Sequence, residues 1–235
     1  MMKKIFNLYN FTIIKILIIN FFTFGKKKNI NFIYKNIKNS YSQIFQDLFV
    51  IYFSNIKKDG SFIEIGVGNG KDLSNTYLLE KKYGWRGILC EPDERNFKNI
   101  EDTRNSKLVK SLISENCNDN VKFYLNEDPY SSSTNQNEGT KKQIYTNSIC
   151  LNHLFEKFKL KDVDYISIDT EGNEYEILKN FNFDRYKVRI FTIEHNFNKN
   201  KRYKIKKLLK NNGYKNILRF ISHMDDWYVL EKSHL

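Results

Sequence analysis

The strongest constraint on the fold is the regular alternation, beyond residue 40, of short apolar runs with segments of helical periodicity. Buried strands are predicted at residues 61–66, 87–91, 108–113, 121–125, 164–169 and 188–194, and closing strands at 214–221 and 227–231. Helices are predicted at residues 41–57, 73–83, 93–104, 173–180 and 201–212. Nearly continuous apolar strands separated by helices are typical of a parallel sheet covered on both faces. Because no helix separates the closing strands, we expect them to pair antiparallel at one edge.

Length and composition favour one α/β domain with a short appendage. The chain has 235 residues, 40% of them hydrophobic, with 19 Phe and 15 Tyr, which is enough apolar surface for a substantial core. We expect residues 41–235 to form the domain and residues 1–40 to form a separate basic and apolar segment. A polar stretch at residues 126–147 interrupts the pattern, and both a mobile lid and a surface loop would fit it.

The N-terminal segment carries most of the net charge. Residues 1–40 contain eight lysines and no acidic residue, so the net charge of +12 leaves only +4 on the rest of the chain. A mildly basic domain argues against a nucleic-acid partner, whereas a basic, partly apolar segment suits an anionic membrane surface. Lys15 and three asparagines interrupt the apolar run, which is therefore too short and too polar to span a bilayer. Peripheral membrane association through residues 1–38 and docking of a helix on the domain or on a partner are both open.

The cysteines bear on the cellular compartment. Cys90, Cys117 and Cys150 are too few and too widely spaced for a disulfide framework or a metal knuckle. Reduced thiols are typical of a reducing compartment, so we expect a cytoplasmic protein, with membrane association as the open addition.

Residues that follow the first two strands predict a nucleoside site, because ligands of open α/β sheets bind beyond the carboxyl ends of the strands. After the first strand, Gly66, Gly68 and Gly70 allow the backbone to turn sharply and to approach a ligand closely. After the second strand, the carboxylate of Glu91 is placed to accept hydrogen bonds from both hydroxyls of a ribose.

Two nucleoside cofactors compete for this site. A dinucleotide site needs the spacing G-x-G-x-x-G at the start of a helix, whereas this chain has G-x-G-x-G followed by Lys71. S-Adenosylmethionine has no phosphate, and its sites commonly place an acidic residue two positions before the first glycine, as Glu64 is here. We therefore favour S-adenosylmethionine. An NAD-dependent oxidoreductase and a non-catalytic methyltransferase-like binding module are the alternatives.

Several motifs together resemble the FkbM family of methyltransferases over about residues 41–230. They are Ser42-Gln43 with Gln46-Asp47, EIGVGNG at 64–70, Ser74-Asn75-Thr76, GWRG at 84–87 with Glu91-Pro92, and DYISIDTEGNEYEIL at 164–178. The resemblance implies a Rossmann-like class I methyltransferase fold, with a mostly parallel seven-stranded sheet, helices on both faces and an antiparallel edge strand. It also implies S-adenosyl-L-methionine as the methyl donor and O-methylation of a hydroxyl, often on a sugar or glycan precursor.

The resemblance further implies which residues bind the cofactor. They are Glu64, Gly66, Gly68, Gly70, Asn75, Glu91, Ser111, Leu112 and Gln46. Glu64 and the glycines would surround the methionine and ribose, and Glu91 would bind the ribose hydroxyls. Ser111 and Leu112 would border the adenine. For Gln46 and Asn75, helix capping or a buried polar role is the alternative to ligand contact.

The acceptor side is predicted at the ends of two later strands. Asp169 ends one strand, and Glu194 and His195 end the next, so these side chains meet if the two strands are neighbours. An alcohol is far less acidic than any side chain here, so proton removal must accompany methyl transfer. His195, or Asp169 with a raised pKa, would act as the base and accelerate the reaction about 10²- to 10⁴-fold.

The candidate catalytic residues are Asp169, His195, Glu194 and Glu171. A divalent metal held by Asp169, Glu194 and His195 is another way to activate a hydroxyl, and it is left open. For Glu171, the alternative is a carboxylate stabilised by the N-terminus of a helix. The expected partner is a small-molecule or glycan substrate.

Overall fold

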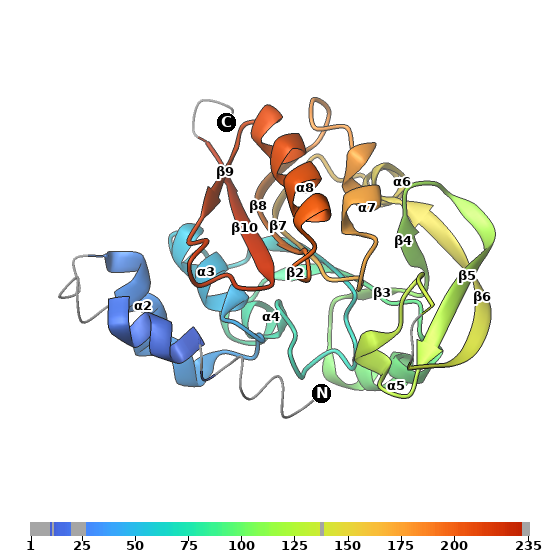
Figure 1. Ribbon diagram of the computed structural model, residues 1–235, viewed down its shortest axis with the longest axis horizontal. Coiled ribbons are helices and arrows are strands. Elements are labelled where there is room, and N and C mark those ends of the chain that lie inside the picture. The colour runs from blue at the N-terminus through green and yellow to red at the C-terminus, as the bar shows by residue number, and fades with distance from the viewer. Residues whose placement is uncertain (1–9, 11, 20–26, 137–138, 232–235) are drawn as a thin grey trace.

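The computed structural model describes residues 10, 12–19, 27–136 and 139–231, and a seven-stranded sheet lies at its centre (Figure 1). The strands are β1 (Ser61–Ile65), β2 (Arg86–Cys90), β3 (Lys107–Val109), β7 (Asp162–Ile168), β8 (Lys187–Glu194), β9 (Tyr214–Ile217) and β10 (Asp225–Leu230). Their order is β3-β2-β1-β7-β8-β10-β9. β10 runs antiparallel to β8 and β9, and the other pairs are parallel. The predicted parallel sheet with an antiparallel pair at one edge is confirmed.

Helices cover both faces of this sheet. One layer consists of α6 (Leu151–Lys157), α7 (Glu174–Lys179) and α8 (Lys199–Asn211). The other consists of α2 (Lys28–Asn36), α3 (Gln46–Phe53), α4 (Tyr77–Tyr83) and α5 (Glu94–Thr103), with a short 3-10 turn η1 (Ile37–Asn39) after α2. Successive side chains of a strand point to opposite faces, so Ile63 packs with the first layer and Phe62 with the second. Burial on both faces explains why the strands are almost entirely apolar.

Helix α3 begins later than the apolar pattern predicts. We expected a helix over residues 41–57, but α3 starts at Gln46. The carboxylate of Asp47 accepts hydrogen bonds from the Ser40 hydroxyl at 2.6 Å and from the Tyr41 backbone N–H at 2.8 Å. These bonds hold the preceding residues in a turn, and Phe45 adopts a left-handed φ of 73°. The pattern misses the turn because Ile44 and Phe45 continue the apolar spacing of the helix that follows.

A second, three-stranded sheet includes the last part of the predicted long loop. Its strands are β4 (Leu112–Ser114), β6 (Thr140–Cys150) and β5 (Asn118–Asn126), in the order β4-β6-β5, with a 3-10 turn η2 (Pro129–Ser131) between β5 and β6. Residues 140–147 are therefore strand, and the expected loop over residues 126–147 is wrong there. Only one residue of β6 is buried, so polar composition hid a strand whose backbone pairs with β5. The predicted strand at 108–113 is divided between β3 and β4.

The described part of the N-terminal segment packs against the domain. Ile16, Ile30 and Ile33 are fully buried in an apolar cluster with Phe49 of α3 and Trp227 of β10. Within the described residues, none of the helices combines the length and the apolar character that a bilayer-spanning segment needs. The remaining part of the segment lies outside the described residues. Peripheral membrane association stays a prediction.

Candidate functional site

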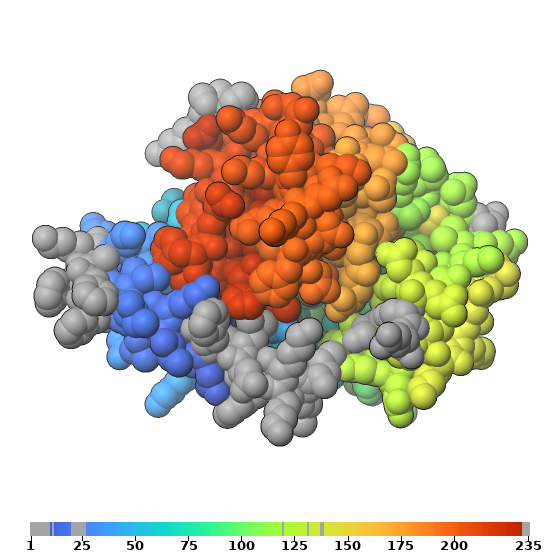
Figure 2. All heavy atoms as spheres, viewed as in Figure 1, coloured from blue at the N-terminus to red at the C-terminus, as the bar shows by residue number. Residues whose placement is uncertain are grey.

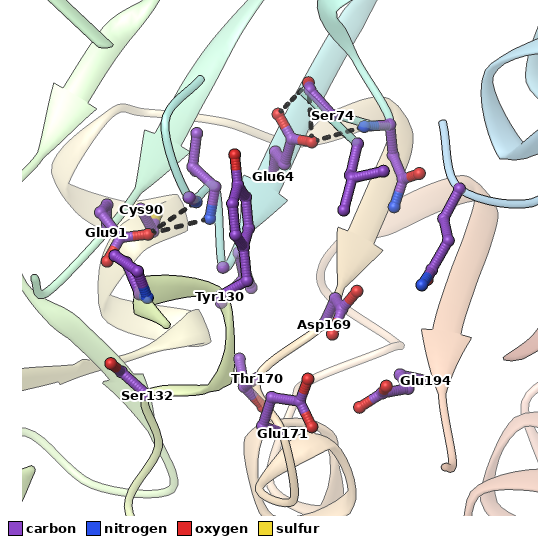
Figure 3. Close-up of a pocket in the computed structure, with 18 of the residues that line it drawn as sticks. Glu64, Ser74, Cys90, Glu91, Tyr130, Ser132, Asp169, Thr170, Glu171 and Glu194 are labelled. Carbon is purple, nitrogen blue, oxygen red and sulfur yellow. Dashed lines mark hydrogen bonds between the residues drawn. The ribbon is translucent and has the colours of Figure 1, made fainter. Parts of the chain in front are cut away.

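A cavity of about 590 Å³ lies at the carboxyl ends of β1, β2, β7 and β8 (Figure 3). Its lining includes Ile65, Cys90, Asp169 and Glu194, which end or directly follow these four strands. Because the strands are parallel neighbours, their carboxyl ends meet at one edge of the sheet. The volume lies within the range of about 300–1,000 Å³ that is typical of small-molecule sites.

The glycine-rich turn after β1 requires glycine at two positions that face the cavity. Gly66 and Gly68 have φ values of 82° and 58°, in the left-handed region that side chains disfavour. A Cβ at Gly66 would lie 1.7 Å from the backbone oxygen of Asp169, and a Cβ at Gly68 would lie 2.4 Å from the ring of Tyr130. Gly70 also has a positive φ, but it packs against Ile100 of α5 and is not among the cavity-lining residues.

Glu91, directly after β2, is buried and joined to the glycine turn. One carboxylate oxygen accepts hydrogen bonds from the N–H groups of Val67 at 3.1 Å and Gly68 at 2.9 Å (Figure 3). The other accepts one from the N–H of Asp93 at 2.9 Å. Burial raises the pKa of Glu91 to about 7. A carboxylate offers about four acceptor positions, so about one remains, on Oε1, for a ligand. The predicted contact of Glu91 with both ribose hydroxyls stays a prediction.

Glu64 lines the cavity, but its carboxylate also holds the segment that leads into α4. It accepts hydrogen bonds from the hydroxyls of Ser74 and Thr76, the latter at 2.6 Å, and from the N–H of Asn75 at 2.7 Å. The guanidinium of Arg104 lies 3.4 Å from the same carboxylate. The predicted contact of Glu64 with the cofactor stays a prediction. Sequence reasoning missed Arg104, because nothing local marks an ion pair between residues forty positions apart.

Asn75 lines the cavity and carries a buried polar atom with no hydrogen-bond partner among the described residues. Its side-chain N–H₂ donates to the hydroxyl of Ser167 at 2.9 Å, whereas its buried Oδ1 has no hydrogen bond to any described residue. Gln46 differs, because both ends of its amide are used. Its N–H₂ donates to Asp225 at 2.8 Å, and its oxygen accepts from the N–H of Ile44 at 3.0 Å. Gln46 therefore has a buried polar role even though it lines the cavity.

The predicted adenine border is only partly at the cavity. Leu112 lies in the apolar wall together with Ile113 and Phe123. The hydroxyl of Ser111 instead donates to the backbone oxygen of Asn147 at 2.9 Å, and Ser111 is not among the lining residues. Sequence reasoning also missed Tyr130, whose ring stands against Gly68 (Figure 3). It belongs to η2, inside the stretch that was expected to be a loop.

Three carboxylates gather at the other end of the cavity. One oxygen from each of Asp169, Glu171 and Glu194 lies within 4.8 Å of the others. β7 and β8 pair in parallel with Ile168 opposite Ile193, which brings Asp169 next to Glu194 as the sequence predicted. Burial raises the pKa of Asp169 well above its ordinary value, and the charge of Glu171 raises it further. Burial and the charge of Asp169 likewise raise the pKa of Glu194.

The helix N-terminus that was considered for Glu171 is occupied by another acid. Glu174, in the first turn of α7, accepts hydrogen bonds from the N–H groups of Thr170 at 3.2 Å and Gly172 at 2.9 Å. It also forms an ion pair with Lys201 of α8 at 2.5 Å. Glu171 instead lines the cavity, where it accepts a hydrogen bond from the side-chain amide of Asn196 at 3.1 Å. Its position favours a role in the site over a helix-terminal one.

His195 is not brought to this cavity. Its side chain is buried, its Nδ1 accepts a hydrogen bond from the N–H of Phe197 at 3.1 Å, and it is absent from the cavity lining. Burial lowers its pKa to about 4. Successive residues of an extended chain point in opposite directions, so the orientation that brings Glu194 to the cavity turns His195 away. The placement therefore disagrees with the prediction of His195 as base or metal ligand.

Comparison with known proteins agrees with this geometry. The family model described as the methyltransferase FkbM domain matches residues 64–222. These residues include the glycine turn, Glu91 and the three carboxylates. No curated protein matches the chain.

Several solved structures are similar in outline. Precorrin-6y C5,15-methyltransferase from Geobacter metallireducens is 14% identical, with 78% of this chain and 85% of that chain covered and a TM-score of 0.44. The fibrillarin pre-rRNA processing protein of Methanococcus jannaschii is 15% identical, with 74% and 67% covered and a TM-score of 0.43. A methyltransferase from Pyrococcus furiosus is 14% identical, with 80% and 82% covered and a TM-score of 0.44.

Proposed function

The chain belongs to the FkbM methyltransferase family, whose cofactor is S-adenosylmethionine, and from this premise we propose that it O-methylates a hydroxyl of a sugar or glycan precursor. One observation carries the proposal. A single cavity joins a glycine turn and Glu91 at one end to three carboxylates at the other. A nucleoside cofactor and a hydroxyl acceptor would thus meet in one cavity.

The residues at the first end suit S-adenosylmethionine. Gly66 and Gly68 let the turn pack closely against Asp169 and Tyr130, where a Cβ would clash, so the backbone of this turn borders the space for the cofactor. Oε1 of Glu91 has room for one ribose hydroxyl, and the unpartnered Oδ1 of Asn75 would accept a hydrogen bond from the amino group of the methionine part. The apolar wall that includes Leu112 would cover the adenine. When bound, the cofactor supplies an electrophilic methyl group on a sulfonium.

The carboxylates at the other end suit a neutral donor of several hydrogen bonds. Ionised carboxylates only accept hydrogen bonds, and a sugar offers neighbouring hydroxyls as donors. In their ionised form these carboxylates would also repel a phosphate, which argues against a nucleic-acid acceptor. Asp169, which lies between the glycine turn and the other two acids, would accept the proton of the attacking hydroxyl. Glu171 and Glu194 would orient the acceptor by accepting further hydrogen bonds.

The test combines cofactor binding with methyl transfer. Calorimetry on the full chain should detect S-adenosylmethionine, and mass spectrometry should find added methyl groups on glycans incubated with enzyme and cofactor. Asp169→Asn should bind the cofactor but lose about 10²- to 10⁴-fold in turnover. Glu176→Gln, which changes an exposed carboxylate of α7, is the control and should keep full turnover. Cofactor binding without transfer to any acceptor would instead support a non-catalytic binding module, and an Asp169→Asn variant with full turnover would contradict the acceptor side.

The proposal includes a cytoplasmic location. It rests on the small number of cysteines in the sequence, although the fold brings the sulfurs of Cys117 and Cys150 within 3.3 Å of each other. Fractionation of cells followed by detection of the full chain would test it.

A further inference from the structure

We propose that Asp169, Glu171 and Glu194 together bind one divalent cation of the Mg²⁺ or Mn²⁺ type at the acceptor end of the cavity. The role of this cation in orienting the acceptor rests on the proposed function. The three residues come from the end of β7, the turn that follows it and the end of β8, and Figure 3 shows their carboxylates gathered at one point. Oxygens that share one such ion lie within about 4–5 Å of each other, and here all lie within 4.8 Å.

An independent observation at Glu194 points to a ligand. The residue is 4% exposed, and its Oε2 has no hydrogen-bond partner among the described residues. A buried carboxylate oxygen that has lost its water and gained no donor is costly for the folded chain. Its carboxylate points into the cluster (Figure 3), where a cation would supply the missing partner.

The basic side chains nearby are already engaged elsewhere. Lys201 pairs with Glu174 at 2.5 Å, and Arg202 pairs with Asp226 at 2.7 Å. In the described part of the chain, no lysine or arginine forms an ion pair with Asp169 or Glu194. Burial and mutual repulsion oppose ionisation of these acids, and a bound divalent cation would favour their ionised forms.

The donor set selects the class of ion. All three ligands are carboxylate oxygens, which favour Mg²⁺, Mn²⁺ and Ca²⁺ over metals that prefer nitrogen or sulfur. His195 is turned away, so it adds no nitrogen ligand. Three protein ligands leave about three positions of an octahedral ion for water or for an oxygen of the acceptor. An acceptor hydroxyl bound there would be held in place and made more acidic.

Mn²⁺ is the probe for this site, because electron paramagnetic resonance measures the free ion directly. Chelator-treated full-length protein should bind one Mn²⁺ per chain, and Mg²⁺ should displace it. Glu194→Gln, which keeps the shape of the side chain, should weaken Mn²⁺ binding by about 10- to 100-fold or more. Glu176→Gln should bind Mn²⁺ like the natural chain, because Glu176 lies on the surface of α7. S-Adenosylmethionine binding by calorimetry checks that each variant is folded, and Asp169→Asn serves as a second ligand variant.

The outcomes separate this proposal from the function on which it rests. Absence of Mn²⁺ binding by the natural chain, or unchanged binding in both Glu194→Gln and Asp169→Asn, would overturn the cation site. Methyl transfer that continues fully in excess chelator would overturn it while leaving the proposed function intact. A chain that binds Mn²⁺ through these carboxylates but never binds S-adenosylmethionine would keep the cation site and overturn the proposed function.

Discussion

Glu91 is the residue in which burial and ligand binding are most directly linked. Its carboxylate is held by three backbone N–H groups, which fix its orientation toward the cavity. Those hydrogen bonds favour the ionised form, but loss of water outweighs them and raises the pKa to about 7. The protonation state of Glu91 therefore changes within the physiological range.

Cofactor affinity should depend on pH through this residue. The ionised carboxylate accepts the ribose hydroxyl, and the protonated form is a much weaker acceptor. Because the pKa is about 7, affinity should fall as the pH falls, by about tenfold between about pH 8 and about pH 6. Calorimetric titration of the natural chain and of Glu91→Gln measures this. The variant should bind more weakly at high pH and show a flatter pH profile, whereas identical profiles would contradict the assignment.

Gly68 offers a test of the close approach at the glycine turn. Gly68→Ala places a Cβ at a φ of 58° and 2.4 Å from the Tyr130 ring. We expect a loss of about 1–3 kcal/mol in the free energy of unfolding, measured by urea denaturation, and weaker cofactor binding. Adding Tyr130→Ala should recover the part of the loss that is due to the clash but not the part that is due to φ. If the stability loss of the double variant equals the sum of the two single losses, the Tyr130 ring moves away from the new Cβ at no cost, and the clash contributes nothing.

Among the elements, the segment between β1 and α4 depends most on a buried charge network. Arg104, at the end of α5, donates to the backbone oxygen of Gly70 at 2.9 Å and to the hydroxyl of Thr76 at 2.7 Å. It also pairs with Glu80 of α4 at 3.1 Å and lies near Glu64 of β1. One side chain thus joins α4, α5, β1 and the glycine turn.

Removing this side chain should destabilise the domain strongly. Arg104→Met keeps much of the volume but leaves Glu64 and Glu80 buried without their cation, which costs about 3–5 kcal/mol of unfolding free energy. Urea denaturation followed by circular dichroism measures the loss. The matched control is Arg185→Met, because Arg185 pairs with Glu156 at the surface with both side chains about half exposed. The control should lose less than about 1 kcal/mol, and equal losses in the two variants would contradict the role of the buried network.

At the scale of the whole molecule, the N-terminal helices and the three-stranded sheet lie at opposite ends, with the α8 layer between them (Figure 2). Residues 12–19 form a helix that buries Ile16 against the domain. Its outer side exposes Ile14, Leu17 and Ile18, which are 42–51% exposed, next to Lys15. Exposed apolar side chains beside basic ones suit the surface of an anionic bilayer.

Vesicle binding tests this surface. The full chain should sediment with vesicles that contain phosphatidylserine and should bind uncharged vesicles much less. Leu17→Asp with Ile18→Asp should reduce the bound fraction, because two charges replace apolar contact, while cofactor binding stays unchanged. Tyr203→Asp, which changes an exposed aromatic residue on α8, is the control. Equal sedimentation of the double variant and the natural chain would remove the membrane prediction.

The sequence by itself determined the features that depend on local pattern. Continuous apolar strands separated by helices require a parallel sheet, and a parallel sheet brings all its carboxyl ends to one edge. The glycine turn, Glu91, Asp169 and Glu194 could therefore be assigned to one site without coordinates. Their positions follow from strand direction alone.

Only the tertiary structure decided which partners these residues meet. Glu64 forms an ion pair with Arg104, and Gln46 donates a hydrogen bond to Asp225, because the fold brings together residues far apart in the chain. Glu171 joins the carboxylates, whereas His195 faces away, because the direction of a side chain depends on the turn at the end of its strand. β6 is a strand because β5 pairs with its backbone, and pairing leaves no trace in a polar sequence. Local composition carries no information about contacts of this kind.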